Sequence, residues 1–318
     1  MMTKARLFVT RQLPEPVMAV LAENFSLTAP PGLSSPPRDA LLTGIRRADA
    51  VISTLTEQID AEAFRHAPDL RVIANYAVGY NNIDLEAAKT NQVIVTNTPD
   101  ILTEATADLT WALLLAAARR VPEGHELVQS RRWTGWEPNQ LLGMDIFGKT
   151  LGIVGMGRIG RAVARRAVGF HMPVLYCRRT TSALEDAAWQ HMPFEQLLAE
   201  ADFISVHVPL TTETHHLIGT AAFQRMRPTA YLLNTSRGPV VDEAALVEAL
   251  REGRLAGAGL DVYEQEPELH PGLLGLKQVV TLPHLGSATL STRIRMGFTC
   301  FDNIVAVLDG RPAPNRVV

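Results

Sequence analysis

Residues 151–160 of the chain read LGIVGMGRIG, a short apolar run that leads into three glycines with G-x-G-x-x-G spacing. The apolar run predicts a buried strand, and residues 161–168 continue with helical character, so the glycines lie on a strand-to-helix turn. In that setting Gly155 permits the tight turn, Gly157 lets backbone approach a pyrophosphate, and Gly160 allows the helix to pack closely on the strand. The free N–H groups at a helix start favour phosphates. The motif therefore predicts a dinucleotide-binding site.

The next apolar run indicates which dinucleotide is bound. Residues 174–177 predict a second strand, and Arg178, Arg179 and Thr180 follow it directly. Units that bind NAD usually place an Asp or Glu there, which accepts hydrogen bonds from the ribose hydroxyls. Two guanidinium groups and a hydroxyl instead suit a 2′-phosphate, although a solvated basic turn is the alternative reading. We therefore expect NADPH to be preferred, with NADH as a second cofactor.

Bulk properties limit the class of protein. A length of 318 residues exceeds one typical domain and fits two, and 47% hydrophobic with 20% charged residues is typical of a soluble globular protein. A net charge of −3 argues against a nucleic-acid partner. No apolar run approaches the ~20 residues that span a bilayer, and the N-terminus lacks the apolar region of a signal peptide. Two cysteines without a disulfide pattern lead us to expect a cytoplasmic protein.

Strand and helix patterns alternate twice along the chain. Short β-branched runs before residue 100 are separated by helical patterns, and a second such series begins at residue 151. This alternation is typical of parallel sheets with helices on both faces. We therefore predict two doubly wound α/β domains with an active-site cleft between them. A helical tail over residues 287–309 is surplus to both sheets.

Polar side chains follow three of the predicted strands, where parallel sheets of this class bind ligands. Arg237 offers the bidentate fork that suits a 2-keto carboxylate, and His284 offers an imidazole. Residues 261–267 supply carboxylates, and a carboxylate beside an imidazole stabilises its charged, proton-donating form. Each group alone also has a structural explanation. His215 and His216 are adjacent and are expected to point in different directions, so no metal site is expected.

Several longer motifs occur together, at residues 78–84, 98–104, 150–160, 236–243, 259–267 and 283–289. With these motifs the chain resembles the D-isomer-specific 2-hydroxyacid dehydrogenases. Within that family it is most similar to bacterial glyoxylate/hydroxypyruvate reductases, also called 2-ketogluconate or 2-ketoaldonate reductases. The resemblance covers essentially the whole chain.

The resemblance implies a division of the chain and a set of roles. Residues 1–102 and 290–318 would form a flavodoxin-like substrate-binding domain, and residues 103–289 a Rossmann NAD(P)-binding domain. Arg237 would bind the substrate carboxylate and carbonyl, His284 would be the acid/base, and Glu266 would orient His284. The backbone amides of Val78 and Gly79 would also bind the carboxylate.

Cofactor contacts and a homodimer are implied in the same way. Asp261 would face the nicotinamide amide, and the segment at Val208 and Pro209 would lie against the cofactor. Dimer contacts would come from the helix near residues 103–120 and the segment through Trp133. The other positions that match cofactor contacts are Thr106, Arg158, Ile159, Thr235, Ser236, His284 and Gly286.

Other activities on the same scaffold are alternatives. Long phosphoglycerate dehydrogenases carry an extra regulatory domain, formate dehydrogenases pair the histidine with an amide, and phosphite dehydrogenases prefer NAD. A non-enzymatic, dinucleotide-sensing corepressor is the alternative from another class. The presence of Arg237, Glu266 and His284 favours an enzyme that reduces small 2-keto acids to D-2-hydroxy acids with NADPH.

Overall fold

The computed structural model describes residues 4–30, 35–179 and 188–318. The chain folds into two compact units: unit 1 comprises Met1–Leu102 and Ser287–Val318, and unit 2 comprises Thr103–Gly286. Within the described ranges, no helix combines the length and apolar character that crossing a membrane requires.

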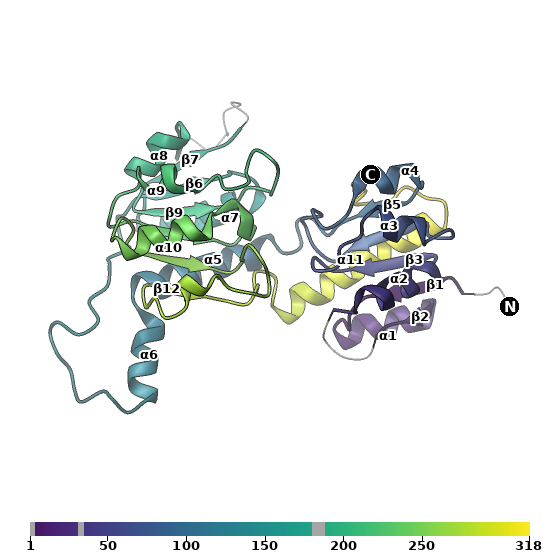
Figure 1. Cartoon of the computed structure of the whole chain (residues 1–318), viewed down its shortest axis with the longest axis horizontal. Coiled ribbons are helices and arrows are strands. Elements are labelled where there is room, and N and C mark those ends of the chain that lie inside the picture. Colours follow the sequence, from purple (N-terminus) through teal and green to yellow (C-terminus); the bar gives the residue numbers. More distant parts are fainter. Residues whose placement is uncertain (1–3, 31–34, 180–187) are drawn as a thin grey trace. The chain divides into compact units, whose positions relative to one another are not determined.

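Unit 1 is built on a five-stranded parallel sheet with the order β2-β1-β3-β4-β5 (Figure 1). Alternate residues of β1 and β3 face opposite layers: Phe8 and Val51 pack with α2, α3 and α4, whereas Leu7 and Ile52 pack with α1 and α11. This order is the flavodoxin-like one that the family resemblance implies. The elements are β1 Arg6–Val9, α1 Glu15–Asn24, β2 Ser26–Thr28, α2 Arg38–Arg46, β3 Ala50–Ser53, α3 Ala61–Arg65, β4 Val72–Asn75, α4 Leu85–Thr90, β5 Ile94–Thr96 and α11 Leu290–Leu308.

Unit 2 contains a seven-stranded parallel sheet with the order β12-β11-β10-β9-β6-β7-β8, which is the doubly wound order of dinucleotide-binding folds. Its helices are α5 Thr103–Ala118, α6 Val121–Gln129, α7 Arg158–Ala167, α8 Phe194–Glu200, α9 Thr220–Phe223 and α10 Glu243–Arg251. Its strands are β6 Leu151–Val154, β7 Val174–Cys177, β8 Trp189–His191, β9 Phe203–Val206, β10 Tyr231–Asn234, β11 Gly257–Leu260 and β12 Val279–Thr281. Three short 3-10 turns are Val168–Phe170, Gly238–Val240 and Pro271–Leu273.

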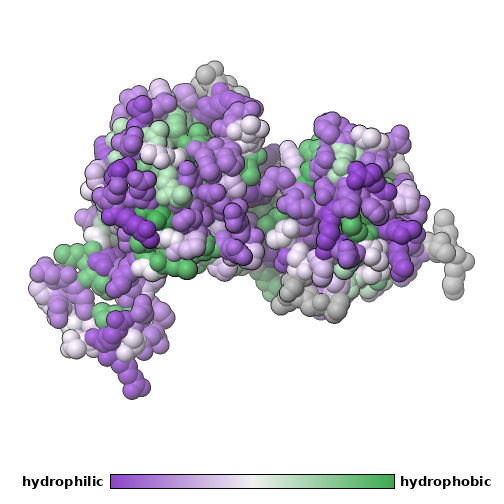
Figure 2. Space-filling view, viewed as in Figure 1, coloured by the Kyte–Doolittle hydropathy of each residue, from purple (hydrophilic) through white to green (hydrophobic). Residues whose placement is uncertain are grey.

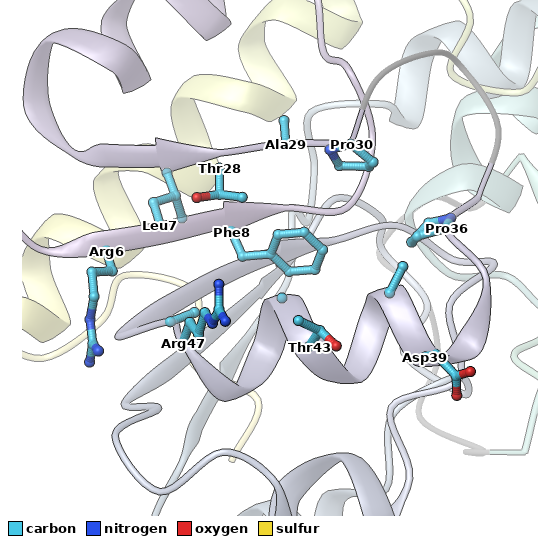
Figure 3. A pocket seen from close by; sticks show the side chains of 13 residues that line it. Arg6, Leu7, Phe8, Thr28, Ala29, Pro30, Pro36, Asp39, Thr43 and Arg47 are labelled. Atoms are coloured by element: carbon cyan, nitrogen blue, oxygen red, sulfur yellow. The ribbon is translucent and has the colours of Figure 1, made fainter.

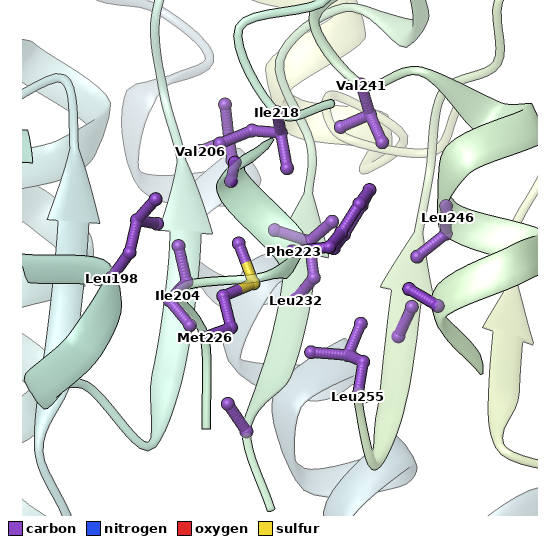
Figure 4. Close-up of a cluster of buried hydrophobic side chains, with 14 of the residues drawn as sticks. Leu198, Ile204, Val206, Ile218, Phe223, Met226, Leu232, Val241, Leu246 and Leu255 are labelled. Atoms are coloured by element: carbon purple, nitrogen blue, oxygen red, sulfur yellow. The ribbon is translucent and has the colours of Figure 1, made fainter. Parts of the chain in front are cut away.

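The core of unit 2 lies on both faces of its sheet. Helices α5 and α7 cover one face, and α8, α9 and α10 cover the other. Figure 4 shows part of the second layer, where Phe223 and Met226 lie beside the strand residues Ile204 and Leu232. The central strands are buried on both faces, which explains why they appear in the sequence as continuous apolar runs.

One part of unit 2 is not packed into this core. Helix α6 has no buried residue, and residues 130–150 that follow it contain no helix or strand. In Figure 1, residues 121–142 project from the rest of unit 2, and the chain then returns to the core, where Ile146 is buried. We call residues 121–142 the α6 arm.

A cavity of about 490 Å³ lies in unit 1 between β1, β2 and α2. The Phe8 ring points toward α2 inside it (Figure 3). A Cβ on Gly44 would lie 2.4 Å from that ring, so the glycine allows the helix to approach it closely. None of the predicted site residues lines this cavity.

Candidate active site

Three neighbouring strands of unit 2 end next to the predicted catalytic residues. β10, β11 and β12 are adjacent and parallel, so their carboxyl ends lie at one edge of the sheet. Arg237 follows β10, Glu266 follows β11, and His284 follows β12. The fold therefore brings to one edge three side chains that lie up to 47 positions apart in the chain.

His284 and Glu266 form a hydrogen-bonded pair. The imidazole Nδ1 lies 2.8 Å from Glu266 Oε2, and the Tyr263 N–H donates to Glu266 Oε1 at 3.1 Å. Burial would raise the pKa of Glu266, but the hydrogen bond and charge of His284 outweigh it and hold this pKa below its usual value. An ionised Glu266 therefore orients the ring, and the bond to Nδ1 leaves Nε2 to exchange a proton.

Arg237 also interacts electrostatically with Glu266. Its Nη1 donates to the Ser236 carbonyl at 2.7 Å, and Asn234 Nδ2 donates to the Arg237 carbonyl at 3.0 Å. Burial lowers the pKa of the guanidinium, and the Glu266 charge opposes that shift. Because Glu266 interacts electrostatically with both cationic groups, it links Arg237 to His284.

Close backbone packing joins the loops that carry these groups. A Cβ on Gly238 would lie 1.8 Å from the carbonyl of Tyr263, so only glycine fits there. Glu243 and Glu264 add a reciprocal pair, in which each carboxylate accepts the other residue's backbone N–H, at 2.7 and 3.0 Å. The loop after β10 and the loop after β11 are therefore fixed against each other.

Asp261 holds the loop that carries His284. Its Oδ1 accepts the Leu285 N–H at 2.6 Å and its Oδ2 accepts the Gly286 N–H at 2.8 Å. The His284 N–H donates to the Asp261 carbonyl at 3.0 Å, while His284 itself has a left-handed φ of 56°. Burial raises the pKa of Asp261. The predicted contact of this side chain with a nicotinamide stays a prediction, and its observed contacts fix the imidazole loop.

The glycine turn has the geometry that a pyrophosphate requires. Gly155 has a φ of 98°, and a Cβ on Gly160 would lie 2.3 Å from the Gly155 carbonyl oxygen. By contrast, nothing lies within 4 Å of a Cβ position on Gly157. Helix α7 begins at Arg158 and Ile159, so its free N–H groups lie beside that open space. The residues present therefore fit a dinucleotide.

The residues expected around the adenosine end cluster near this turn. The Gly155 N–H donates to the Cys177 carbonyl at 3.0 Å, which ties the turn to the strand end that precedes Arg178 and Arg179. A Cβ on Gly155 would lie 2.8 Å from Val208 Cγ1, so the segment of Val208 and Pro209 also adjoins the turn. Thr180 lies outside the described residues.

Buried hydroxyl groups connect other predicted cofactor positions. Thr106 Oγ1 donates to the Gly286 carbonyl at 3.1 Å, and the hydroxyls of Thr110 and Thr235 lie 2.9 Å apart. The Ser236 hydroxyl donates to Asn234 Oδ1 at 2.8 Å. Thr106, Thr235, Asp261 and Gly286 thus lie close together within unit 2.

Val78 and Gly79 lie in unit 1, on the loop after β4. Asn97 Nδ2 donates to the Val78 carbonyl at 2.8 Å, and Asn75 Nδ2 donates to the Gly79 carbonyl at 2.7 Å. The sequence analysis did not select these two asparagines. The sequence did contain a sign of their importance. Asn75 ends a parallel strand and Asn97 directly follows one, and the residues selected in unit 2 also follow strands.

The expectation that His215 and His216 point in different directions is wrong. Their rings stack with centroids 4.0 Å apart, because His216 has a left-handed φ of 52° that turns its side chain back along the chain. Among the residues that the structure describes, no His, Cys, Asp and Glu cluster is suited to hold a metal ion.

Comparisons with known proteins show the family to which the chain belongs. The family model for the D-isomer specific 2-hydroxyacid dehydrogenase, NAD binding domain, matches residues 111–286. A glyoxylate reductase of Thermococcus gammatolerans is 47% identical over 99% of this chain and 96% of its own length. A crystal structure of a Thermus thermophilus protein, 48% identical, superposes with a TM-score of 0.93 over 98% of this chain and all of that chain.

A third comparison concerns a relative with bound ligands. It is the NADPH-dependent glyoxylate/hydroxypyruvate reductase of Sinorhizobium meliloti, in complex with NADP and malonate, which is 32% identical. Its TM-score is 0.88, and the match covers 99% of this chain and 97% of that chain. The chain belongs to the D-isomer-specific 2-hydroxyacid dehydrogenase family. This membership supports an oxidoreductase that acts on a 2-keto acid.

Proposed function

We propose that the chain is an NADPH-dependent reductase that converts small 2-keto acids, such as glyoxylate, hydroxypyruvate or 2-ketogluconate, into D-2-hydroxy acids. The observation that carries this proposal is the 2.8 Å pair of His284 and Glu266 at the sheet edge that also holds Arg237. A proton donor and a fixed cation are the two groups that reduction of a 2-keto acid demands from the protein.

NADPH, when bound, supplies the hydride. His284 Nε2 gives a proton to the carbonyl oxygen, and Glu266 keeps the imidazole oriented for that transfer. Arg237 binds the carboxylate and polarises the carbonyl. The amides of Val78 and Gly79 bind the same carboxylate, which fixes the substrate's orientation.

The cofactor is held by the glycine turn and by the start of α7. The other residues that hold it are Thr106, Val208, Pro209, Thr235, Ser236 and Gly286. Asp261 contacts the nicotinamide amide in addition to holding the His284 loop. Arg178 and Arg179 bind the 2′-phosphate, a role supported by the NADPH dependence of the Sinorhizobium meliloti relative.

The direct test is a panel of steady-state measurements. We expect measurable kcat/KM on glyoxylate, hydroxypyruvate or 2-ketogluconate, with higher values for NADPH than for NADH. Tight NADPH binding by fluorescence titration without turnover of any 2-keto acid would instead indicate a dinucleotide sensor. Turnover only of phosphite or 3-phosphoglycerate would assign another activity of the same scaffold.

Replacing Arg178 by aspartate is expected to change the cofactor preference. The aspartate repels a 2′-phosphate and accepts hydrogen bonds from the ribose hydroxyls of NADH. Because a hydrogen bond to a charged group contributes about 1.5–3 kcal/mol, the NADPH/NADH ratio of kcat/KM should fall at least about tenfold. Arg225→Asp, at an exposed position, is the control. An unchanged ratio in Arg178→Asp would show that this arginine does not select the cofactor.

We also propose that the protein is a homodimer in which the α6 arm contacts the second copy. Large apolar side chains lie exposed on this arm, including Trp136 at 81% and Leu142 at 65% exposure, and Figure 2 shows apolar residues on its surface. A helix without a fully buried side chain gains little stability from packing within its own subunit. Contact with a second copy would provide the missing burial.

Introducing aspartates at Trp136 and Leu142 should convert the dimer to monomers. Interface aromatic residues commonly contribute about 2 kcal/mol or more, so the double variant should weaken association at least about thirtyfold. Light scattering coupled to size exclusion measures the mass. Leu274→Asp changes a similarly exposed leucine outside the arm and should leave the mass unchanged. A double variant that remains dimeric would place the interface elsewhere.

A further inference from the structure

Three successive carbonyl groups on the loop after β4 are held by hydrogen bonds. The Thr98 N–H donates to the Ala77 carbonyl at 2.9 Å. The next two carbonyls, of Val78 and Gly79, accept from the side-chain amides of Asn97 at 2.8 Å and Asn75 at 2.7 Å. The donors therefore come from the ends of two adjacent strands, β4 and β5.

Fixing a carbonyl also fixes the next N–H group. In a trans peptide the C=O and the following N–H lie in one plane and point in opposite directions. The three carbonyl contacts therefore aim the N–H group of Val78 away from Thr98, that of Gly79 away from Asn97 and that of Tyr80 away from Asn75. Among residues 4–30, 35–179 and 188–318, these three N–H groups have no protein acceptor. Backbone N–H groups without a protein acceptor are available to bind an anion.

The two asparagines that hold the loop are themselves held in place. Asn75 is completely buried, and the Ser53 hydroxyl donates to its Oδ1 at 3.2 Å, so its Nδ2 faces Gly79. Asn97 is half-buried, and its own N–H donates to the Asn315 carbonyl at 3.2 Å. The Asn75 side chain therefore cannot rotate without losing hydrogen bonds, and the backbone that carries the Asn97 side chain is held in place.

We infer that Asn75 and Asn97 are positioning residues that orient the backbone amides of Val78, Gly79 and Tyr80 toward the substrate carboxylate. This inference rests on the proposed reductase function and adds Tyr80 N–H as a third donor. Neither asparagine touches the substrate. Their contribution is to make the carboxylate site rigid before the substrate arrives.

The test compares Asn97→Asp and Asn97→Ala with the wild type. Aspartate has the same shape but places an oxygen against the Val78 carbonyl, so the peptide plane is no longer held. A hydrogen bond of ordinary net strength predicts a rise in the KM for the 2-keto acid of about three- to tenfold, with kcat changed by less than about twofold. The NADPH Kd, a property of unit 2, should not change.

A matched control and a binding measurement complete the design. Asn91→Ala removes another side-chain amide that donates to a carbonyl in unit 1, at an exposed helix end, and should leave KM unchanged. Calorimetric titration with malonate in the presence of NADPH should show affinity for Asn97→Asp that is weaker by the same factor as KM. Asn75→Ala should raise KM in the same way as the Asn97 variants, and if it does not fold, the two Asn97 variants still decide the question.

The outcomes separate this inference from the proposed function. A wild type that reduces no 2-keto acid contradicts the proposed function itself. An active wild type whose Asn97 variants keep both KM and malonate affinity overturns the positioning role alone. A loss confined to kcat, with KM unchanged, also overturns it.

Discussion

The His284→Gln variant is expected to reduce 2-keto acids about 10²–10⁴-fold more slowly than the wild type near neutral pH, because it lacks the group that protonates the carbonyl oxygen. Glutamine can still accept or donate hydrogen bonds, so the loop held by Asp261 should remain in place. Steady-state kcat with saturating NADPH measures the loss. Retained NADPH binding by fluorescence shows that the variant is folded.

The pH dependence makes this prediction more specific. In the wild type the imidazolium is the acid, so the reduction rate should fall as the pH rises and the ring loses its proton. The pKa of Glu266 is held below its usual value, so this carboxylate stays ionised through the neutral range and its effect is lost only in acid. His284→Gln should therefore lack the alkaline decline. His66→Gln, at an exposed position, should keep it. A His284→Gln variant with the wild-type rate and profile would remove His284 from the mechanism.

The predictable part of this fold came from buried parallel strands. Such strands can be recognised in the sequence as continuous apolar runs, because helices cover both faces of the sheet, as at residues 151–154. The edge strands Ser26–Thr28 and Trp189–His191 were not predicted, since each has three mostly exposed residues and no apolar run. Helix α6 was missed for a related reason, because none of its residues is fully buried.

The site residues could likewise be predicted only where a local sequence pattern marks them. His284 and Arg237 could be selected from the sequence because they follow predicted strands. Ligands bind at the carboxyl ends of parallel strands, so a polar side chain just after a strand is a candidate site residue. Asn75 ends a strand and Asn97 follows one, but both act on backbone carbonyls, and a sequence pattern does not show which carbonyl an amide reaches. The contact of Asp261 with the Leu285 and Gly286 amides was likewise not predictable, because it depends on a left-handed φ at His284.

Replacing Arg237 by methionine should lower kcat/KM for 2-keto acids by at least about 10²–10³-fold, the loss typical of removing one donor that stabilises a developing oxyanion. Methionine keeps much of the apolar volume of the arginine stem but provides no charge. Arg237→Lys should recover only part of the activity, because an ammonium lacks the planar fork that binds a carboxylate through two bonds. Arg225→Met is the control, and the NADPH Kd should be unchanged in all three variants.

Charge coupling through Glu266 gives a second measurement on Arg237→Met. Glu266 interacts with the charges of both His284 and Arg237. Removing the guanidinium takes a positive charge away from the imidazolium, so the alkaline decline of the residual rate should move to higher pH. Glu266→Gln removes the negative charge instead and should move the decline to lower pH. If the alkaline decline moves in opposite directions in the two variants, Arg237 and Glu266 both act on the His284 imidazole. If it moves in the same direction, they do not act on the same imidazole.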